Sequence, residues 1–209
     1  MRALKACFDA NRAWAASMQE QDAGFFDRLR HQQTPDLLWI GCSDSRLTPN
    51  QILNRAPGEV FVHRNVGNVV VHTDMNFLSV LQYGVEVLGV RDVIVCGHLG
   101  CGGVRAALGT KPLGLIDNWL RHIRDVAMRH RGEIEALTDE VAREDRLCEL
   151  NVAAQVENVC HTTIVQDACR RGQPLAVHGW VYALADGLLR DLDVCVERPD
   201  QIPSAYRLG

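Results

Sequence analysis

The sequence predicts an α/β fold, with a central mainly parallel β-sheet (a four-stranded core with an added edge strand) that is flanked by helices and preceded by a helical arm. Short apolar runs alternate with amphipathic segments from residue 37 onward, a pattern typical of parallel strands joined by helices. The last two runs, 174–184 and 188–197, flank Asp186-Gly187. This spacing predicts a hairpin and therefore an antiparallel edge.

Each element follows from its local pattern. Residues 37–42 (LLWIGC), 59–65 and 91–98 are apolar or β-branched runs of strand length. Residues 73–89 place apolar side chains at helical spacing, behind Thr73 or Asp74 as the N-cap. The other predicted helices are 3–30, 101–108, 114–131 and roughly 139–171, with a polar connection at 132–138.

The length of 209 residues suits one domain, 1–209, in which a helical arm (1–30) precedes an α/β core (31–209). The arm carries a broken apolar stripe that includes Phe8 and Trp14. Two interpretations of this stripe remain open: it packs against a partner subunit, or it packs against the core of its own chain. The chain has no internal repeat and no low-complexity linker.

Composition excludes several classes of function. A formal net charge of -4 gives no electrostatic argument for binding nucleic acid or an anionic membrane. No run approaches the roughly 20 apolar residues of a membrane span, and the first residues lack a secretory pattern, so we expect a cytoplasmic protein. The eight cysteines are scattered, so most are expected to be small buried side chains and one or two to be ligands or nucleophiles.

Potential metal ligands follow two of the predicted strands. Cys42, Asp44 and Arg46 alternate at the end of the first strand, which places them on one face, and His98 ends the third strand shortly before Cys101. Ligands gather at the carboxyl ends of parallel strands, and two thiolates with an imidazole suit zinc. Taken singly, these residues also fit a buried core cysteine, a structural histidine and a loop held by an Asp–Arg pair.

Cys101 begins a predicted helix, where backbone N–H groups favour its thiolate. The glycines around it do not form a nucleotide loop. The segment GHLGCGGVRA lacks the lysine of a P-loop, and Arg105 stands where a G-x-G-x-x-G motif needs its last glycine.

The motifs CSDSR (42–46) and HLGCGG (98–103) resemble those of the β-class carbonic anhydrases. The resemblance extends over nearly the whole chain, including the segments 57–70, 78–98, 114–125 and 175–187. It implies a zinc enzyme in which Cys42, His98 and Cys101 bind Zn²⁺ and a zinc-bound hydroxide attacks CO2 to give bicarbonate and a proton.

The resemblance also implies a role for the two charged residues after Cys42. Paired with Arg46, Asp44 accepts a hydrogen bond from the zinc-bound hydroxide; released from Arg46, it becomes the fourth zinc ligand and closes the site. Two thiolates neutralise Zn²⁺, so the bound water should be less acidic than the pKa of about 7 of a three-histidine site, and activity should require mildly alkaline pH.

Two further groups of residues match family positions. Gln33, Phe61, Val66 and Tyr83 correspond to the substrate pocket, where a dimeric arrangement brings Gln33 and Tyr83 from the neighbouring chain; without the resemblance, the last three fit plain core packing. Trp39, Arg64 and Tyr182 match a non-catalytic bicarbonate pocket of the allosteric bacterial members, where bicarbonate favours the closed site. The family assembles as homodimers or homotetramers.

One departure concerns the segment after Arg46, which reads LTPN where many relatives carry Val-Pro. Leu47 is bulkier and the proline falls at position 49, which changes the residue with a fixed φ. Two alternative functions also fit the motifs: a non-catalytic zinc or redox-sensing module, and a hydrolase of carbonyl sulfide or carbon disulfide on the same fold.

Overall fold

The computed structural model describes residues 4–208, and the chain divides into two units, Met1–Thr34 and Pro35–Gly209. The first unit holds helices α1 (Lys5–Gln21) and α2 (Phe25–His31), in which no described residue is buried. The region 3–30, predicted to be helical, therefore consists of two helices, and residue 3 lies outside the described residues. The chain turns because the Asp22 carboxylate accepts the Gly24 N–H and pairs with Arg28.

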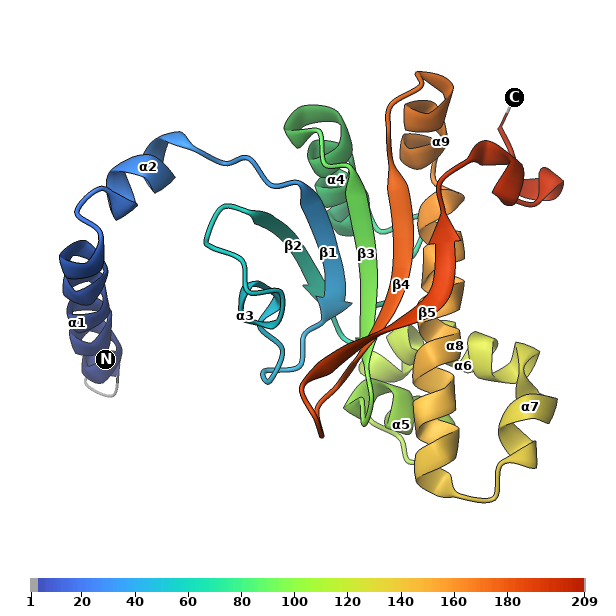
Figure 1. Cartoon of the computed structure of the whole chain (residues 1–209). Coiled ribbons are helices and arrows are strands. Elements are labelled where there is room, and N and C mark those ends of the chain that lie inside the picture. The colour runs from blue at the N-terminus through green and yellow to red at the C-terminus, as the bar shows by residue number, and fades with distance from the viewer. Residues whose placement is uncertain (1–3, 209) are drawn as a thin grey trace. The chain divides into compact units, whose positions relative to one another are not determined.

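The second unit is built on a five-stranded sheet of order β2-β1-β3-β4-β5 (Figure 1). The first four strands pair in parallel and β5 pairs antiparallel to β4, as predicted. Gly187, at φ +74°, lies in the turn between β4 and β5. The strands are β1 (Leu37–Cys42), β2 (Val60–Asn65), β3 (Asp92–His98), β4 (Ala176–Ala183) and β5 (Leu188–Val196).

Helices connect the strands and cover the sheet. The helix predicted for 73–89 begins at Asp74, whose side chain accepts the Asn76 N–H, and ends in a π-helix. The described helices of this unit are α3 (Pro49–Ile52), α4 (Met75–Gln82), the π-helix η2 (Tyr83–Leu88), α5 (Gly102–Leu108), α6 (Ile116–Arg129), α7 (Arg131–Ala136), α8 (Glu140–Cys160), α9 (Thr163–Arg170) and the 3-10 turns η3 (Pro199–Gln201) and η4 (Ser204–Tyr206).

Two helical predictions were wrong in detail. The polar stretch at 132–138 was expected to be a connection, but most of it is helix α7, which buries Ile134. The helix predicted for 139–171 divides into α8 and α9 because the Thr162 side chain caps the second helix by accepting the Val165 N–H. Both errors follow from short segments in which one buried or capping side chain decides the outcome.

Helix α8 packs along β3, β4 and β5, while α5, α6 and α7 pack around its first half (Figure 1). An apolar cluster between these helices and the strand ends contains Cys42 and Cys101 together with Leu120 and Ile123 of α6 and Leu147 of α8. The carboxyl ends of the adjacent strands β1 and β3 therefore pack against a cluster of buried apolar side chains.

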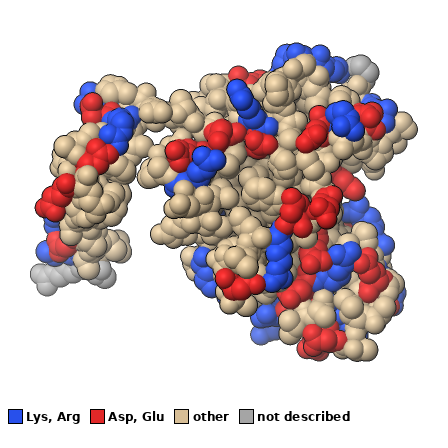
Figure 2. Space-filling view, in the orientation of Figure 1, with Lys and Arg blue, Asp and Glu red and all other residues tan. Residues whose placement is uncertain are grey.

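The surface carries charges of both signs. Figure 2 shows acidic and basic side chains interspersed over the face in view, with no large region of one sign. Among the described residues, none of the helices is long and apolar enough to cross a membrane.

Candidate metal centre

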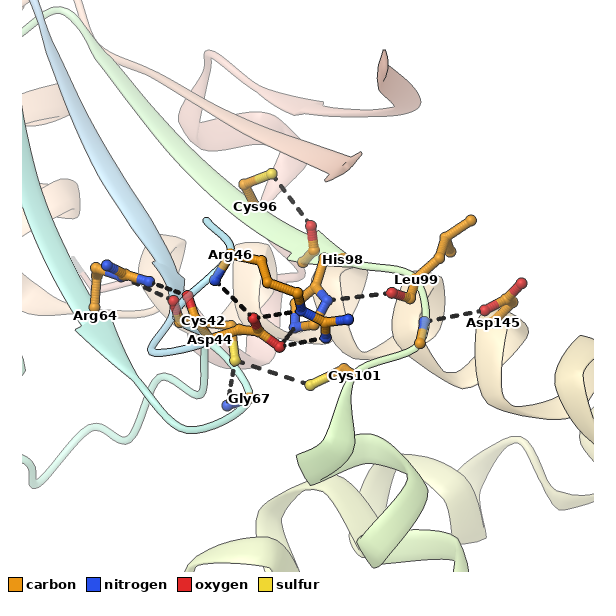
Figure 3. Close-up of polar contacts among 12 residues, drawn as sticks. Cys42, Asp44, Arg46, Arg64, Gly67, Cys96, His98, Leu99, Cys101 and Asp145 are labelled. Atoms are coloured by element: carbon orange, nitrogen blue, oxygen red, sulfur yellow. Dashed lines mark hydrogen bonds and ion pairs between the residues drawn. The ribbon is translucent and has the colours of Figure 1, made fainter. Parts of the chain in front are cut away.

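Cys42, His98 and Cys101 form the single cluster of potential metal ligands found among residues 4–208. Their donor atoms lie within 4.8 Å of one another, and the two sulfur atoms are 3.9 Å apart (Figure 3). All three residues are buried. The fold brings them together because β1 and β3 are adjacent parallel strands, and Cys101 follows β3 after a turn in which Gly100 adopts φ +67°.

The donors of this cluster fit a zinc ion. Nε2 of His98 is buried and has no hydrogen-bond partner. Its other ring nitrogen, Nδ1, lies 3.2 Å from the Leu99 carbonyl oxygen. A proton on Nδ1 leaves the Nε2 lone pair free, which is the arrangement of a metal-binding histidine. With two cysteine thiols, this nitrogen completes a set of donors preferred by zinc.

The pKa values of the two cysteine thiols are shifted in opposite directions. Hydrogen bonding from the Cys101 thiol, supported by the Gly67 amide, lowers the pKa of Cys42 well below that of an ordinary thiol despite burial. The pKa of Cys101 is raised, because its thiol is hydrogen-bonded to Cys42 Sγ and is buried. A second thiolate beside the first therefore needs a cation to stabilise it.

Asp44 and Arg46 form a two-point ion pair next to this cluster. Arg46 Nε donates to Asp44 Oδ1 at 2.9 Å and Nη2 donates to Oδ2 at 2.6 Å (Figure 3). The Arg46 guanidinium holds the pKa of Asp44 well below its usual range. The lowered pKa keeps this carboxylate ionised. Its Oδ2 lies 3.7 Å from His98 Nε2, which places it at the edge of the ligand cluster.

Arg64, predicted to bind bicarbonate, makes contacts that the sequence did not suggest. From β2 its Nε donates to the Cys42 carbonyl at 2.9 Å, and its Nη2 donates to the Asp44 carbonyl (Figure 3). Trp39 and Tyr182, predicted for the same pocket, belong to one apolar cluster on the sheet. The indole N–H of Trp39 is buried and has no partner.

The predicted substrate residues are divided among different surroundings. Val66 packs against the apolar cluster that contains Cys42. Phe61 packs against the other large cluster, and its ring centroid lies 5.9 Å from that of Tyr83, which is 45% exposed. Gln33 belongs to the first unit and is exposed.

The segment after Arg46 is anchored by Leu47, whose side chain is 1% exposed and packs in the apolar cluster of Cys42 and Cys101. The Leu47 N–H donates to the Asp44 carbonyl at 3.1 Å. Pro49 begins helix α3, a position where its fixed φ is favourable.

Sequence reasoning missed three groups that contact this centre or its supporting loop. The Gly67 N–H donates to Cys42 Sγ at 3.4 Å. Trp119 and Asn151 donate from α6 and α8 to the carbonyls of Val66 and Gly67. Gly67, shortly after the end of β2, was the one local signal for these contacts, because the residues that form them are distant from one another in sequence.

A mainly parallel sheet with two cysteines and a histidine at its carboxyl edge defines this chain as an α/β protein with a zinc-type site. Comparison with known proteins is more specific. The family model for carbonic anhydrase matches residues 37–189, most of the chain. The chain therefore belongs to the β-carbonic anhydrase family.

The relatives support this assignment over nearly the whole chain. A carbonic anhydrase of Emericella nidulans is 47% identical over 187 residues, which cover 90% of this chain and 82% of that protein. The β-carbonic anhydrase of Coccomyxa in complex with acetazolamide has a TM-score of 0.90 and 40% identity, covering 95% of this chain and 90% of that one. A tetrameric β-carbonic anhydrase of Sordaria macrospora has a TM-score of 0.89 and 36% identity, covering 94% and 100%.

These findings confirm the predicted class, fold and cofactor. The protein is a carbonic anhydrase, an enzyme that hydrates CO2, and its cofactor is zinc.

Proposed function

We propose that the chain catalyses the reversible hydration of CO2 to bicarbonate and a proton at the Cys42–His98–Cys101 centre, with Asp44 and Arg46 as a switchable dyad. The observation that carries this proposal is the two-point Asp44–Arg46 pair beside three protein donors. A catalytic zinc has three protein ligands and an open position, whereas a structural zinc has four. A carboxylate that is restrained by an arginine beside the three donors has no use in a structural site.

The side chains divide the work as follows. Cys42 Sγ, His98 Nε2 and Cys101 Sγ would hold zinc, which would supply Lewis-acid activation of a water molecule for attack on CO2. Asp44 Oδ2 accepts a hydrogen bond from the attacking water and so directs its lone pair toward CO2. Arg46 keeps the carboxylate in that orientation. If Arg46 were released, Asp44, whose Oδ2 lies 3.7 Å from His98 Nε2, would be free to bind the zinc itself and so block the site.

The substrate pocket is proposed to need a second copy of the chain. Val66 lies beside the ligand cluster, while Phe61 and Tyr83 form a ring pair that is partly exposed. The expected assembly is a homodimer or a homotetramer. In it, Gln33 and Tyr83 of the neighbouring chain would face CO2 or bicarbonate. The tetrameric relative from Sordaria macrospora is consistent with such an assembly. The Coccomyxa relative forms a complex with acetazolamide, and we expect this enzyme to bind acetazolamide as well.

Bicarbonate and pH are proposed to control the enzyme through Trp39, Arg64 and Tyr182. The free indole N–H of Trp39 is a donor available to an anion. Arg64 links that pocket to the dyad, because it donates to the carbonyls of Cys42 and Asp44. Bicarbonate that attracts the guanidinium loosens the loop around Asp44. Bicarbonate shifts the equilibrium only because it binds the closed form better.

Stopped-flow CO2 hydration from about pH 6.5 to 9, with zinc quantified in the same sample, tests the proposal. We expect fast hydration that rises with pH at one zinc per chain, because two thiolates make zinc a weaker acid. Full zinc without hydration at pH 9 would favour a non-catalytic zinc or redox-sensing module. Faster turnover of carbonyl sulfide or carbon disulfide than of CO2 would assign the alternative hydrolase. A cytoplasmic location remains a prediction that fractionation tests.

A further inference from the structure

The peptide group that joins Val66 to Gly67 contacts a ligand thiol on one side and an indole on the other. Its N–H donates to Cys42 Sγ at 3.4 Å (Figure 3), and its carbonyl accepts a hydrogen bond from Trp119 Nε1 at 2.7 Å. Both bonds belong to one planar amide, so each polarises the amide in the direction that strengthens the other.

Neighbouring side chains hold this peptide in place. Gly67 has φ +78°, and a Cβ there would lie 2.7 Å from Ile123 Cδ1 on α6, the helix that also carries Trp119. On the other side the Gly67 carbonyl accepts a hydrogen bond at 2.9 Å from Asn151, which is 1% exposed on α8. Rotation of the peptide away from Cys42 therefore breaks buried hydrogen bonds, which is costly.

We propose that Trp119 is a positioning residue of the metal centre, which holds and polarises the Val66–Gly67 amide so that its N–H withdraws charge from Cys42 Sγ. This inference rests on the proposed role of Cys42 as a zinc ligand. A thiolate that donates less charge leaves more positive charge on the metal, which then acidifies water more strongly. Trp119 thus partly offsets the weaker acidity that a two-thiolate ligand set imposes.

The test compares Trp119→Phe, which keeps an aromatic ring but removes the N–H donor, with wild type in the Co(II)-substituted protein. We expect the thiolate-to-Co(II) charge-transfer band to move to longer wavelength, because a thiolate with a weaker hydrogen bond donates more strongly. In the zinc enzyme the pH midpoint of CO2 hydration should rise by about half a unit.

Trp180→Phe is the matched control. The Trp180 indole N–H is buried without a partner, so its removal should move neither the charge-transfer band nor the pH midpoint. If Trp119→Phe is folded and also moves neither, the inference is overturned. If wild type itself shows no thiolate band, the assignment of Cys42 and Cys101 as ligands fails, which is a separate outcome.

A second measurement on the wild-type chain covers a Trp119→Phe variant that does not fold. In the ¹¹³Cd-substituted protein, a hydrogen bond between the Gly67 amide and a ligand sulfur should give a scalar coupling between the cadmium nucleus and the amide proton. We expect that coupling at Gly67. Its absence, with couplings to the Cys42 and Cys101 side-chain protons present, overturns the inference.

Discussion

The guanidinium of Arg46 and the carboxylate of Asp44 are paired by two hydrogen bonds, yet they differ in their access to water. The Arg46 side chain is 57% exposed and the Asp44 side chain 16%. The arginine can therefore exchange its partner for water at a small cost, whereas the carboxylate, left alone, needs another partner. In the switch proposed for Asp44, zinc held by the neighbouring Cys42–His98–Cys101 cluster would be that partner.

Replacing Arg46 tests whether this pairing serves catalysis. Arg46→Lys keeps the charge but loses the two-point contact, so we expect kcat/KM for CO2 hydration to fall by about 10- to 100-fold, a range typical of a lost positioning contact. Arg105→Lys is the matched control, because Arg105 forms an exposed pair with Glu144. Stopped-flow measurement of CO2 hydration at pH 8 compares the two variants. Equal rates would refute a catalytic role of the Asp44–Arg46 pair.

Removing one thiol tests the ligand assignment. Cys101→Ser should reduce zinc from one per chain to a small fraction and abolish CO2 hydration, because a serine hydroxyl is a poor zinc ligand. Cys160→Ser removes an equally buried thiol outside the cluster and should retain zinc. Metal analysis after dialysis against a chelator measures both. A Cys101→Ser protein that keeps a full complement of zinc would contradict the assignment.

His63 makes stability depend on pH. Burial lowers the pKa of its imidazole, an effect only partly opposed by Asp74. The unfolded state therefore binds a proton more readily, so the contribution of His63 to stability is complete above its unfolded pKa of about 6.5 and is lost as pH falls below that value.

His63→Asn should remove part of this dependence. Urea unfolding at pH 7.5 and at pH 5.5 gives the loss of unfolding free energy, which should be smaller for the variant than for wild type. His31→Asn, an exposed site in the first unit, serves as the control and should behave like wild type. An identical loss in His63→Asn and wild type would show that the imidazole is not responsible.

Gly97, between Cys96 and the metal-site histidine, is required for the approach of β3 to α8. A Cβ at this position would lie 2.6 Å from Val152 Cγ2, so Gly97→Ala should lower the unfolding free energy by about 1–3 kcal/mol. Gly132→Ala in helix α7 meets no atom within 4 Å and should raise it by up to about 1 kcal/mol. Urea denaturation measures both; a neutral Gly97→Ala would mean that α8 shifts to make room.

Bicarbonate inhibition tests the control proposed for Trp39. We expect wild type to be inhibited by bicarbonate at low pH and to show a sigmoidal pH dependence. Trp39→Phe removes the free indole donor and should weaken that inhibition severalfold, an effect typical of one lost hydrogen bond. Trp180→Phe is again the control. A pH profile of single-proton shape in wild type, insensitive to bicarbonate, would exclude the allosteric pocket.

The main chemistry could be predicted because it depends on local patterns. The strand ending at Cys42 and the strand ending at His98 were recognisable from short apolar runs, and the rule that parallel strands share a carboxyl edge placed their ligands together. The interval from His98 to Cys101 needed one tight turn, which Gly100 makes.

The supporting contacts could not be predicted because they join distant parts of the chain. The Gly67 N–H reaches a sulfur 25 residues away, and Trp119 reaches a carbonyl 53 residues away. Local sequence describes the donors but not their partners. Helix α7 was missed for a related reason: its sequence, RGEIEA, buries one side chain, that of Ile134, and a single buried residue sets no recognisable period.

Burial of the Leu47 side chain raises the free energy of any loop conformer around Arg46 in which that side chain is exposed. A loop conformer that exposes this side chain loses about 2 kcal/mol of apolar burial, so on that basis it is populated about 30-fold less than the conformer described. An effector acting through the exposed conformer must bind it more than about 30-fold better merely to make the two equal. The leucine thereby biases the loop toward the conformer in which Arg46 is paired with Asp44.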